Sequence, residues 1–204
     1  MQTVKEYVFI FDIGNVMLDF DLEDLQKAIA TDANIGLTRV RTEWQHPDFV
    51  DVETGRIEPE QHFALLSSRL GLTWTFAQYV DYWAGLFKVN PAGRQLYLEL
   101  HQKGYRVAML SNLGAHHWTA IQRRFPDFFT VGEQCFFSFA LGLHKPDPRI
   151  YRAVCRELKV KPDQCVFLDD REDNVLGARS IGMHAHPYSA NDPRPAEQFI
   201  AAFL

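Results

Sequence analysis

The sequence has few cysteines, no excess of positive charge and no long apolar run. Only three cysteines occur among 204 residues, and no two are spaced as CxxC, which favours reduced thiols in a cytoplasmic protein over a disulfide-stapled secreted one. The formal net charge is -5, so neither nucleic acid nor an anionic membrane is expected as a partner. Charged residues crowd the short apolar run that ends at Asp12, so no signal peptide is expected. No apolar run approaches the ~18 residues of a membrane span.

What the sequence does contain is an alternation of short apolar runs and helical patterns. Runs rich in β-branched and aromatic residues predict buried parallel strands at 8–11, 105–110, 135–139, 165–168 and 183–186. Helices are expected between them at 91–103, 148–158 and 174–181, and the first of these has proline at its start and glycine just past its end. This alternation predicts an α/β fold with a doubly wound parallel sheet.

A long interval, residues 19–90, separates the first expected strand from the second. Helical patterns occur there at 22–30, 59–70 and 76–87, and no strand is expected. A crossover between parallel strands needs only about a dozen residues. We therefore expect a helical cap subdomain over 19–88, inserted after the first strand, and an α/β core domain over 1–18 and 89–204. A loop at 189–195 should precede a short closing helix.

Polar residues follow four of the expected strands. They form the stretches Asp12-Ile13-Gly14-Asn15, Ser111-Asn112, His144-Lys145 and Asp169-Asp170. In open α/β sheets ligands bind beyond the carboxyl ends of the strands, so these stretches should meet at one edge. Carboxylates suit Mg2+, a lysine and backbone amides suit phosphate oxygens, and a carboxylate can itself be the nucleophile. The set indicates phosphoryl transfer with Mg2+ as the cofactor.

In this order, FDIGNV, LSN, HKPD and FLDDREDN resemble the four motifs of the haloacid dehalogenase (HAD) superfamily of hydrolases. The resemblance covers nearly the whole chain, including the cap. The FDxGNV form of the first motif and the cap fragment ETGRI at 53–57 are similar to the α-D-glucose-1-phosphate phosphatase-like subgroup. The resemblance implies a Rossmann-like core and a phosphatase for a small phosphorylated metabolite, sugar phosphates included, acting through an aspartyl-phosphate.

The resemblance also implies roles for individual residues. Asp12 would be the nucleophile and a metal ligand, and Lys145 the lysine that neutralises Asp12 and the phosphate. Ser111 and Asn112 would bind the phosphate. The remaining assignments are Asp170 as the main metal ligand, Asp169 as a ligand directly or through water, and Arg56 in the cap as a contact to the leaving group.

Gly14 departs from the usual pattern of the family. Most family phosphatases carry a second aspartate at this position, whose carbonyl binds the metal and whose side chain acts as general acid and base. Gly14 can supply the carbonyl but not the proton. It could equally be a glycine that a positive φ requires. The proton must then come from water, from the substrate or from a cap residue, unless the leaving group departs unaided.

Two other functions fit parts of the sequence. A 2-haloacid dehalogenase needs neither the second carboxylate nor a metal, and a phosphate-binding protein with weak or no catalysis would also tolerate Gly14; a phosphomutase is disfavoured because it depends on the missing acid. His116 and His117 are expected in solvent at a helix start. Trp44, Trp74 and Trp83 are expected in the core of the cap. The chain is expected to be a monomer or a homodimer.

Overall fold

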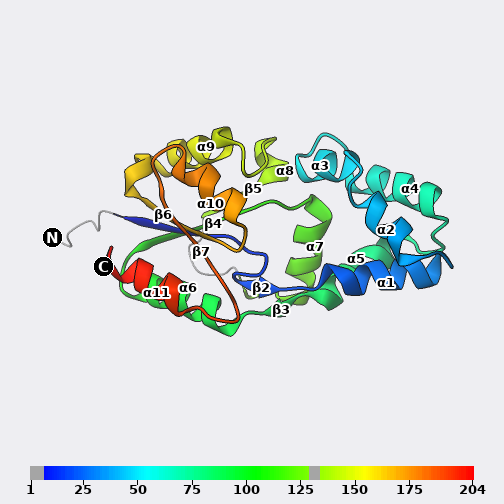
Figure 1. The fold of residues 1–204 in the computed structure, drawn as a ribbon, viewed down its shortest axis with the longest axis horizontal. Helices are drawn as coiled ribbons and strands as arrows, with labels where there is room; N and C mark the ends of the chain where they lie inside the picture. Colours follow the sequence, from blue (N-terminus) through cyan, green and yellow to red (C-terminus); the bar gives the residue numbers. More distant parts are fainter. Residues whose placement is uncertain (1–6, 129–133) are drawn as a thin grey trace.

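The chain forms a parallel sheet flanked by helices, with a helical region beyond one end of the sheet (Figure 1). The structure is a computed structural model that describes residues 7–128 and 134–204. The first six residues, which belong to the expected core domain and to the stretch from which no signal peptide is expected, lie outside the described residues.

Five parallel strands form the central sheet, and the expected α/β fold class is confirmed. They are β1 (Val8–Phe11), β4 (Arg106–Ser111), β5 (Gln134–Phe137), β6 (Cys165–Asp169) and β7 (His184–Pro187), in the order β5-β4-β1-β6-β7. All four residues of β1 are buried, because β1 lies between β4 and β6 and helices cover both faces. Its carboxyl end is therefore a rigid support for the residue that follows, Asp12.

The side chains of β1 alternate between two separate cores. Phe9 and Phe11 pack with residues of α6 (Pro91–Gln102) and α11 (Arg194–Ala201) on one face of the sheet. Val8 and Ile10 pack on the other face. That face is covered by α9 (Pro148–Leu158) and α10 (Glu172–Arg179). This period of two is what a strand covered on both faces requires.

Five further helices, α1 (Leu22–Asp32), α2 (Leu37–Glu43), α3 (Asp48–Glu53), α4 (Pro59–Leu70) and α5 (Phe76–Leu86), fill the interval after the first strand. α5 packs against α7 (Ala115–Arg124), which follows β4. Among residues 7–128 and 134–204, no helix is long and apolar enough to cross a lipid bilayer. The boundaries of the cap and core domains stay a prediction.

The expectation of no strand between 19 and 90 is wrong. β2 (Leu18–Asp19) pairs antiparallel with β3 (Lys88–Val89), so a short ribbon joins the two points where the chain enters and leaves the cap. The two residues of β3 are exposed and too few to show an apolar period, so the sequence carries no signal for them. The Asn90 side chain donates to the Asp19 carboxylate at 2.9 Å and ties the same point together.

The strand expected at 135–139 ends two residues earlier. β5 stops at Phe137, and Ser138 begins a short helix, α8 (Ser138–Leu141). The backbone N–H of Leu113 donates to the Ser138 hydroxyl at 3.0 Å, which turns the chain toward the end of β4. The apolar pattern continued through Phe139, but this side-chain bond ends the strand.

Candidate active site

The polar residues that follow the strands line one pocket of about 560 Å3 between the sheet and the cap helices. It is lined by Asp12 after β1, Ser111 and Asn112 at the end of β4, and Lys145 and Asp170. The four motifs therefore meet at one edge of the sheet, as expected. Asp169 lies beneath this surface, fully buried and in contact with Lys145.

Asp12 is held rigidly at the floor of the pocket. Its Oδ1 accepts a hydrogen bond from the Ile13 backbone N–H at 2.7 Å and lies 3.1 Å from Lys145 Nζ. Burial raises the pKa of Asp12 to about 7, although Lys145 opposes the shift and the carboxylates of Asp169 and Asp170 add to it. Burial therefore opposes the ionised form of Asp12, and the two neighbouring carboxylates add to that cost.

Lys145 is a buried cation with a partner for each of its three N–H groups. Nζ donates to the Leu110 carbonyl at 3.0 Å and to Asp169 Oδ2 at 2.5 Å, and it pairs with Asp12. Burial alone would lower the pKa of Lys145, but Asp12 and Asp169 raise it above its ordinary value. The lysine is therefore a fixed positive charge that holds two carboxylates in place.

Asp12, Asp169 and Asp170 form the one group of potential metal ligands found among the described residues, with ligand atoms within 4.8 Å of one another. Asp169 has little left to offer, because it also accepts hydrogen bonds from the Arg171 backbone N–H and the Asn174 amide, both at 2.9 Å. Asp170 is the most exposed of the three. Its Oδ2 accepts a hydrogen bond from the Asn15 amide at 3.0 Å. This arrangement supports Asp170 as the direct ligand and Asp169 as the anchor of Lys145.

A hydrogen-bonded chain runs from β4 across the pocket to the cap. The Asn112 amide donates to the Lys145 carbonyl at 2.9 Å and accepts from the Lys145 N–H at 2.8 Å, which fixes its orientation. Its NH2 group also lies 3.1 Å from His144 Nδ1, so Nδ1 accepts and Nε2 carries the proton toward Glu53 at 2.8 Å. His144 and Glu53 had no assigned role in the sequence. Asn112 acts here through its side chain.

Gly14 does not adopt a positive φ, so that interpretation of the glycine is wrong. The left-handed residue of this turn is Asn15, with φ 52°. What Gly14 provides is space, because a Cβ at this position would lie 3.0 Å from the Phe20 ring. An aromatic ring therefore lies directly beside Gly14, and the sequence gives no sign of it because Phe20 approaches only in the folded chain.

Arg56 does not join the other predicted site residues. Its guanidinium is exposed, pairs with Asp51 at 2.7 Å and is not part of the pocket lining. Trp44 and Trp83 do line the pocket, so their expected place in the cap core is only part of their role. Trp74 stacks on Tyr82 with ring centroids 5.2 Å apart, outside the pocket.

The expectation that His116 and His117 lie in solvent is wrong. His116 is buried, its ring centroid is 3.9 Å from that of His117, and His62 of the cap lies 6.3 Å away. Burial lowers the pKa of His62 to about 4 and that of His116 well below the ordinary value, and the neighbouring histidines add to the shift. The packing of α5 against α7 covers these rings. A contact between two helices so far apart in the chain cannot be predicted from the periodicity of either helix.

These buried histidines predict a loss of stability in acid. His62 is fully buried, and neither ring nitrogen has a hydrogen-bond partner among the described residues. Asp48, whose Oδ1 lies 3.7 Å from Nε2, opposes the fall in pKa, but burial outweighs it, so the fold favours the neutral ring. Its pKa is lower in the folded chain than in the unfolded chain, so the unfolded state binds more protons and stability falls as pH falls from about 6.5 toward 4. Between pH 7 and pH 5 this residue alone should cost about 2 kcal/mol of unfolding free energy.

Urea unfolding of wild type and His62→Gln at these two pH values measures that difference. The variant should lose about 2 kcal/mol less than wild type on acidification. His101→Gln, in the last turn of α6, is the matched control and should lose as much as wild type. An equal loss in His62→Gln and wild type would contradict the prediction.

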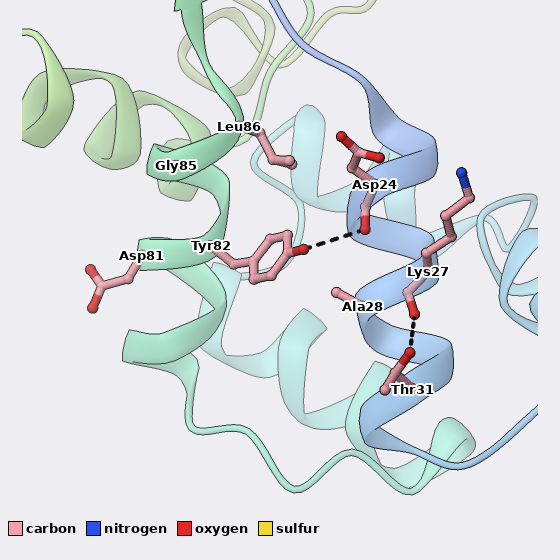
Figure 2. A pocket seen from close by; sticks show the side chains of 8 residues that line it. All are labelled: Asp24, Lys27, Ala28, Thr31, Asp81, Tyr82, Gly85 and Leu86. Carbon is pink, nitrogen blue, oxygen red and sulfur yellow. Dashed lines mark hydrogen bonds between the residues drawn. The ribbon is translucent and has the colours of Figure 1, made fainter.

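A second concavity of about 600 Å3 lies between α1 and α5 on the outside of the cap (Figure 2). Two of its hydroxyls already bond within it, since the Tyr82 hydroxyl donates to the Asp24 carbonyl at 3.4 Å and Thr31 donates to the Lys27 carbonyl at 2.9 Å. Lys27 and Asp81 are paired with Glu23 and Arg123, which lie outside its lining. It contains no cluster of carboxylates among the described residues. The two concavities are similar in volume, so size does not identify the active site. The pocket beyond β1 is the better candidate because it holds the group of carboxylates.

Comparison with known proteins gives one family. Residues 8–182 match the haloacid dehalogenase-like hydrolases. The sesquiterpene phosphatase astK of Aspergillus oryzae is 26% identical over 184 residues, which are 85% of each chain. The D-ribitol-5-phosphate phosphatase of Bacteroides thetaiotaomicron is 25% identical over 186 residues, which are 85% of this chain and 87% of the relative.

The solved structures confirm the fold. The HAD family enzyme bt-2542 of Bacteroides thetaiotaomicron, in complex with magnesium and inorganic phosphate, superposes with a TM-score of 0.77. The match is 23% identical and covers 91% of this chain and 96% of that one. These comparisons name the family and not the glucose-1-phosphate phosphatase-like subgroup, which stays a prediction.

Proposed function

Because this chain belongs to the haloacid dehalogenase-like hydrolases, we propose that it is a Mg2+-dependent phosphatase that hydrolyses a small phosphate monoester through Asp12. The observation that carries this proposal is that Asp12, Lys145, Asp169 and Asp170 lie together beyond the carboxyl ends of the strands, with all but Asp170 buried. Relatives that are named as phosphatases of a sesquiterpene and of D-ribitol 5-phosphate support it. Sugar phosphates remain among the candidate substrates.

The residues present fit a divalent cation. Burial raises the pKa of Asp12 to about 7, and the carboxylates of Asp169 and Asp170 add to the shift. A cation between these three carboxylates would favour their ionised forms. Asp12 and Asp170 would hold it directly, and Gly14 would offer its carbonyl. When bound, Mg2+ would neutralise phosphate oxygens that the carboxylates otherwise repel.

The residues of the chain would perform two displacements. Asp12 attacks phosphorus, the bond to the ester oxygen breaks, and that oxygen leaves with the electron pair. Water then attacks the aspartyl-phosphate, which releases inorganic phosphate and restores the carboxylate. Lys145 holds Asp12 in position through both steps, and Ser111 donates a hydrogen bond at the same floor. Gly14 gives no proton to the leaving oxygen, so the proton would come from water, from the substrate or from a cap residue, unless the leaving group departs unaided.

Metal removal tests this function. Chelation should abolish hydrolysis of p-nitrophenyl phosphate, and added Mg2+ should restore it. Asp170→Asn should raise the Mg2+ concentration for half-maximal activity by about tenfold or more, because one charged ligand is lost. Calorimetric Mg2+ binding should weaken by the same factor.

The matched control for this experiment is Asp173→Asn. Asp173 lies three residues further on and pairs with Arg171 at 2.7 Å, but it does not line the pocket, so Mg2+ dependence should stay unchanged. Activity that survives complete chelation would contradict the mechanism. Halide release from a short chloroacid under the same conditions would favour the 2-haloacid dehalogenase alternative, and tight phosphate binding without turnover would favour a binding protein.

We further propose that the enzyme works in the cytoplasm, as a monomer or a homodimer, on a soluble phosphorylated compound. The sequence has only three cysteines, and no two are spaced as CxxC, which supports a reducing compartment. The net charge of -5 supports neither a nucleic acid nor an anionic membrane as partner.

A further inference from the structure

Above its polar floor, the pocket is lined almost entirely by apolar side chains of the cap. The cap residues that line it are aromatic and aliphatic side chains and one carboxylate: Phe20, Leu22, Trp44, Phe49, Val50, Glu53, Trp83 and Phe87. The Glu53 carboxylate is already paired with His144 at 2.8 Å. Apart from the tryptophan N–H groups and the second oxygen of Glu53, these cap side chains offer the hydroxyls of a sugar or polyol no hydrogen-bonding group.

The apolar wall begins beside the nucleophile itself. The Phe20 ring lies against Gly14, where a Cβ would come within 3.0 Å of it. Phe20 in turn packs edge-on against Phe87, with centroids 5.7 Å apart, and lies 6.1 Å from Trp83. The position from which an acid would reach the leaving oxygen is thus continuous with the rest of the wall.

Few polar groups from the core compensate for this wall. His117 Nδ1 accepts from the Gly114 N–H at 3.0 Å, so Nε2 of this neutral ring is a single donor toward the pocket. The exposed Arg171 pairs with Asp173 at 2.7 Å. A hydroxyl placed against carbon loses its hydrogen bonds to water, whereas a methylene placed there gains from burial.

We propose that the substrate is a phosphate monoester of an apolar alcohol, with the phosphate on the floor of the pocket and the hydrocarbon against the wall of Phe20, Trp44 and Phe87. This inference rests on the proposed phosphatase function and narrows its substrate class. Selectivity would come from burial of the carbon skeleton, and the leaving alkoxide would still need a proton, which Gly14 cannot supply.

A matched pair of substrates tests the proposal with the whole enzyme and Mg2+. Cyclohexylmethyl phosphate and glucose 6-phosphate both carry a six-membered ring on a primary phosphate ester, and they differ mainly in the hydroxyls. We expect kcat/KM to be at least about tenfold higher for cyclohexylmethyl phosphate. From ethyl to hexyl phosphate, kcat/KM should rise by up to about fourfold per methylene, since the leaving group barely changes along this series.

The outcomes separate this proposal from the function on which it rests. Hydrolysis of p-nitrophenyl phosphate with a preference for glucose 6-phosphate or ribitol 5-phosphate would overturn the apolar substrate and leave the phosphatase in place. A flat response to chain length would overturn it as well. No hydrolysis of any monoester would overturn the phosphatase, and this inference with it.

Variants of two tryptophans locate the wall. Trp44 lines the pocket and packs on Phe49 with centroids 4.7 Å apart, whereas Trp74 packs on Tyr82 outside it; both are half-buried. Trp44→Ala should lower the ratio of kcat/KM for hexyl over ethyl phosphate by about tenfold. Trp74→Ala should leave that ratio within about twofold of wild type. Equal effects of the two substitutions would overturn the assignment of the wall.

Discussion

Asp12→Asn should lower kcat for p-nitrophenyl phosphate by about a thousandfold or more, because an amide is a poor nucleophile and the aspartyl-phosphate cannot form. The substitution keeps the shape of the side chain, and its Oδ1 can still accept from the Ile13 N–H, which lies 2.7 Å away in the wild type. Thermal stability should change little or rise, because burial and two neighbouring carboxylates already make the charge of Asp12 costly.

Two measurements make this result interpretable. Burst kinetics or mass spectrometry of acid-quenched enzyme should detect a phosphorylated protein in wild type and none in Asp12→Asn. Asp192→Asn, an exposed carboxylate that pairs with Arg194, is the matched control and should keep wild-type turnover. If Asp12→Asn retained more than about a tenth of the activity, another residue would be the nucleophile.

Lys145→Met should damage both activity and stability. The side chain is 1% exposed and separates Asp12 from Asp169, so its removal leaves two buried carboxylates without a counter-charge. Breaking a buried ion pair by removing one partner costs about 3–5 kcal/mol. Turnover should fall by about a hundredfold or more, because Asp12 loses the contact that positions it.

Lys145→Arg separates charge from shape in this experiment. Arginine keeps the positive charge, but its planar fork cannot place three N–H groups on Leu110, Asp12 and Asp169 as the ammonium does, so turnover should remain low while stability partly recovers. Lys103→Met, just past the end of α6, is the exposed control and should match wild type in urea unfolding and in rate. Wild-type turnover in Lys145→Met would contradict a role for the lysine.

The fold was predictable from the sequence where local rules act alone. The helices at 59–70 and 148–158 begin and end as expected, because each has proline in its first turn and a left-handed residue just past its end. The edges of β5 and the ribbon of β2 and β3 were not predictable. They depend on one side-chain bond from Ser138 and on a pairing between residues about seventy positions apart.

The candidate site divides in the same way. Asp12, Lys145 and Asp170 follow strands, and the rule that parallel strands end at one edge was enough to bring them together. The roles of Phe20, Glu53 and His117 depend on where the cap folds over that edge. Each lies on a segment whose local pattern predicts only a helix or a turn. The residues that each of them faces across the pocket are known only from the folded chain.

The short ribbon of β2 and β3 has a consequence for how this protein can be engineered. Leu18 pairs with Val89 and Asp19 with Lys88, so the residues on either side of the cap leave the sheet as immediate neighbours. A segment whose two ends are already joined can be shortened, lengthened or exchanged at little cost in chain closure. We therefore expect that a different cap grafted between residues 19 and 88 would change the substrate and keep the catalytic residues in place, provided that it also covers the face of α7 on which α5 packs.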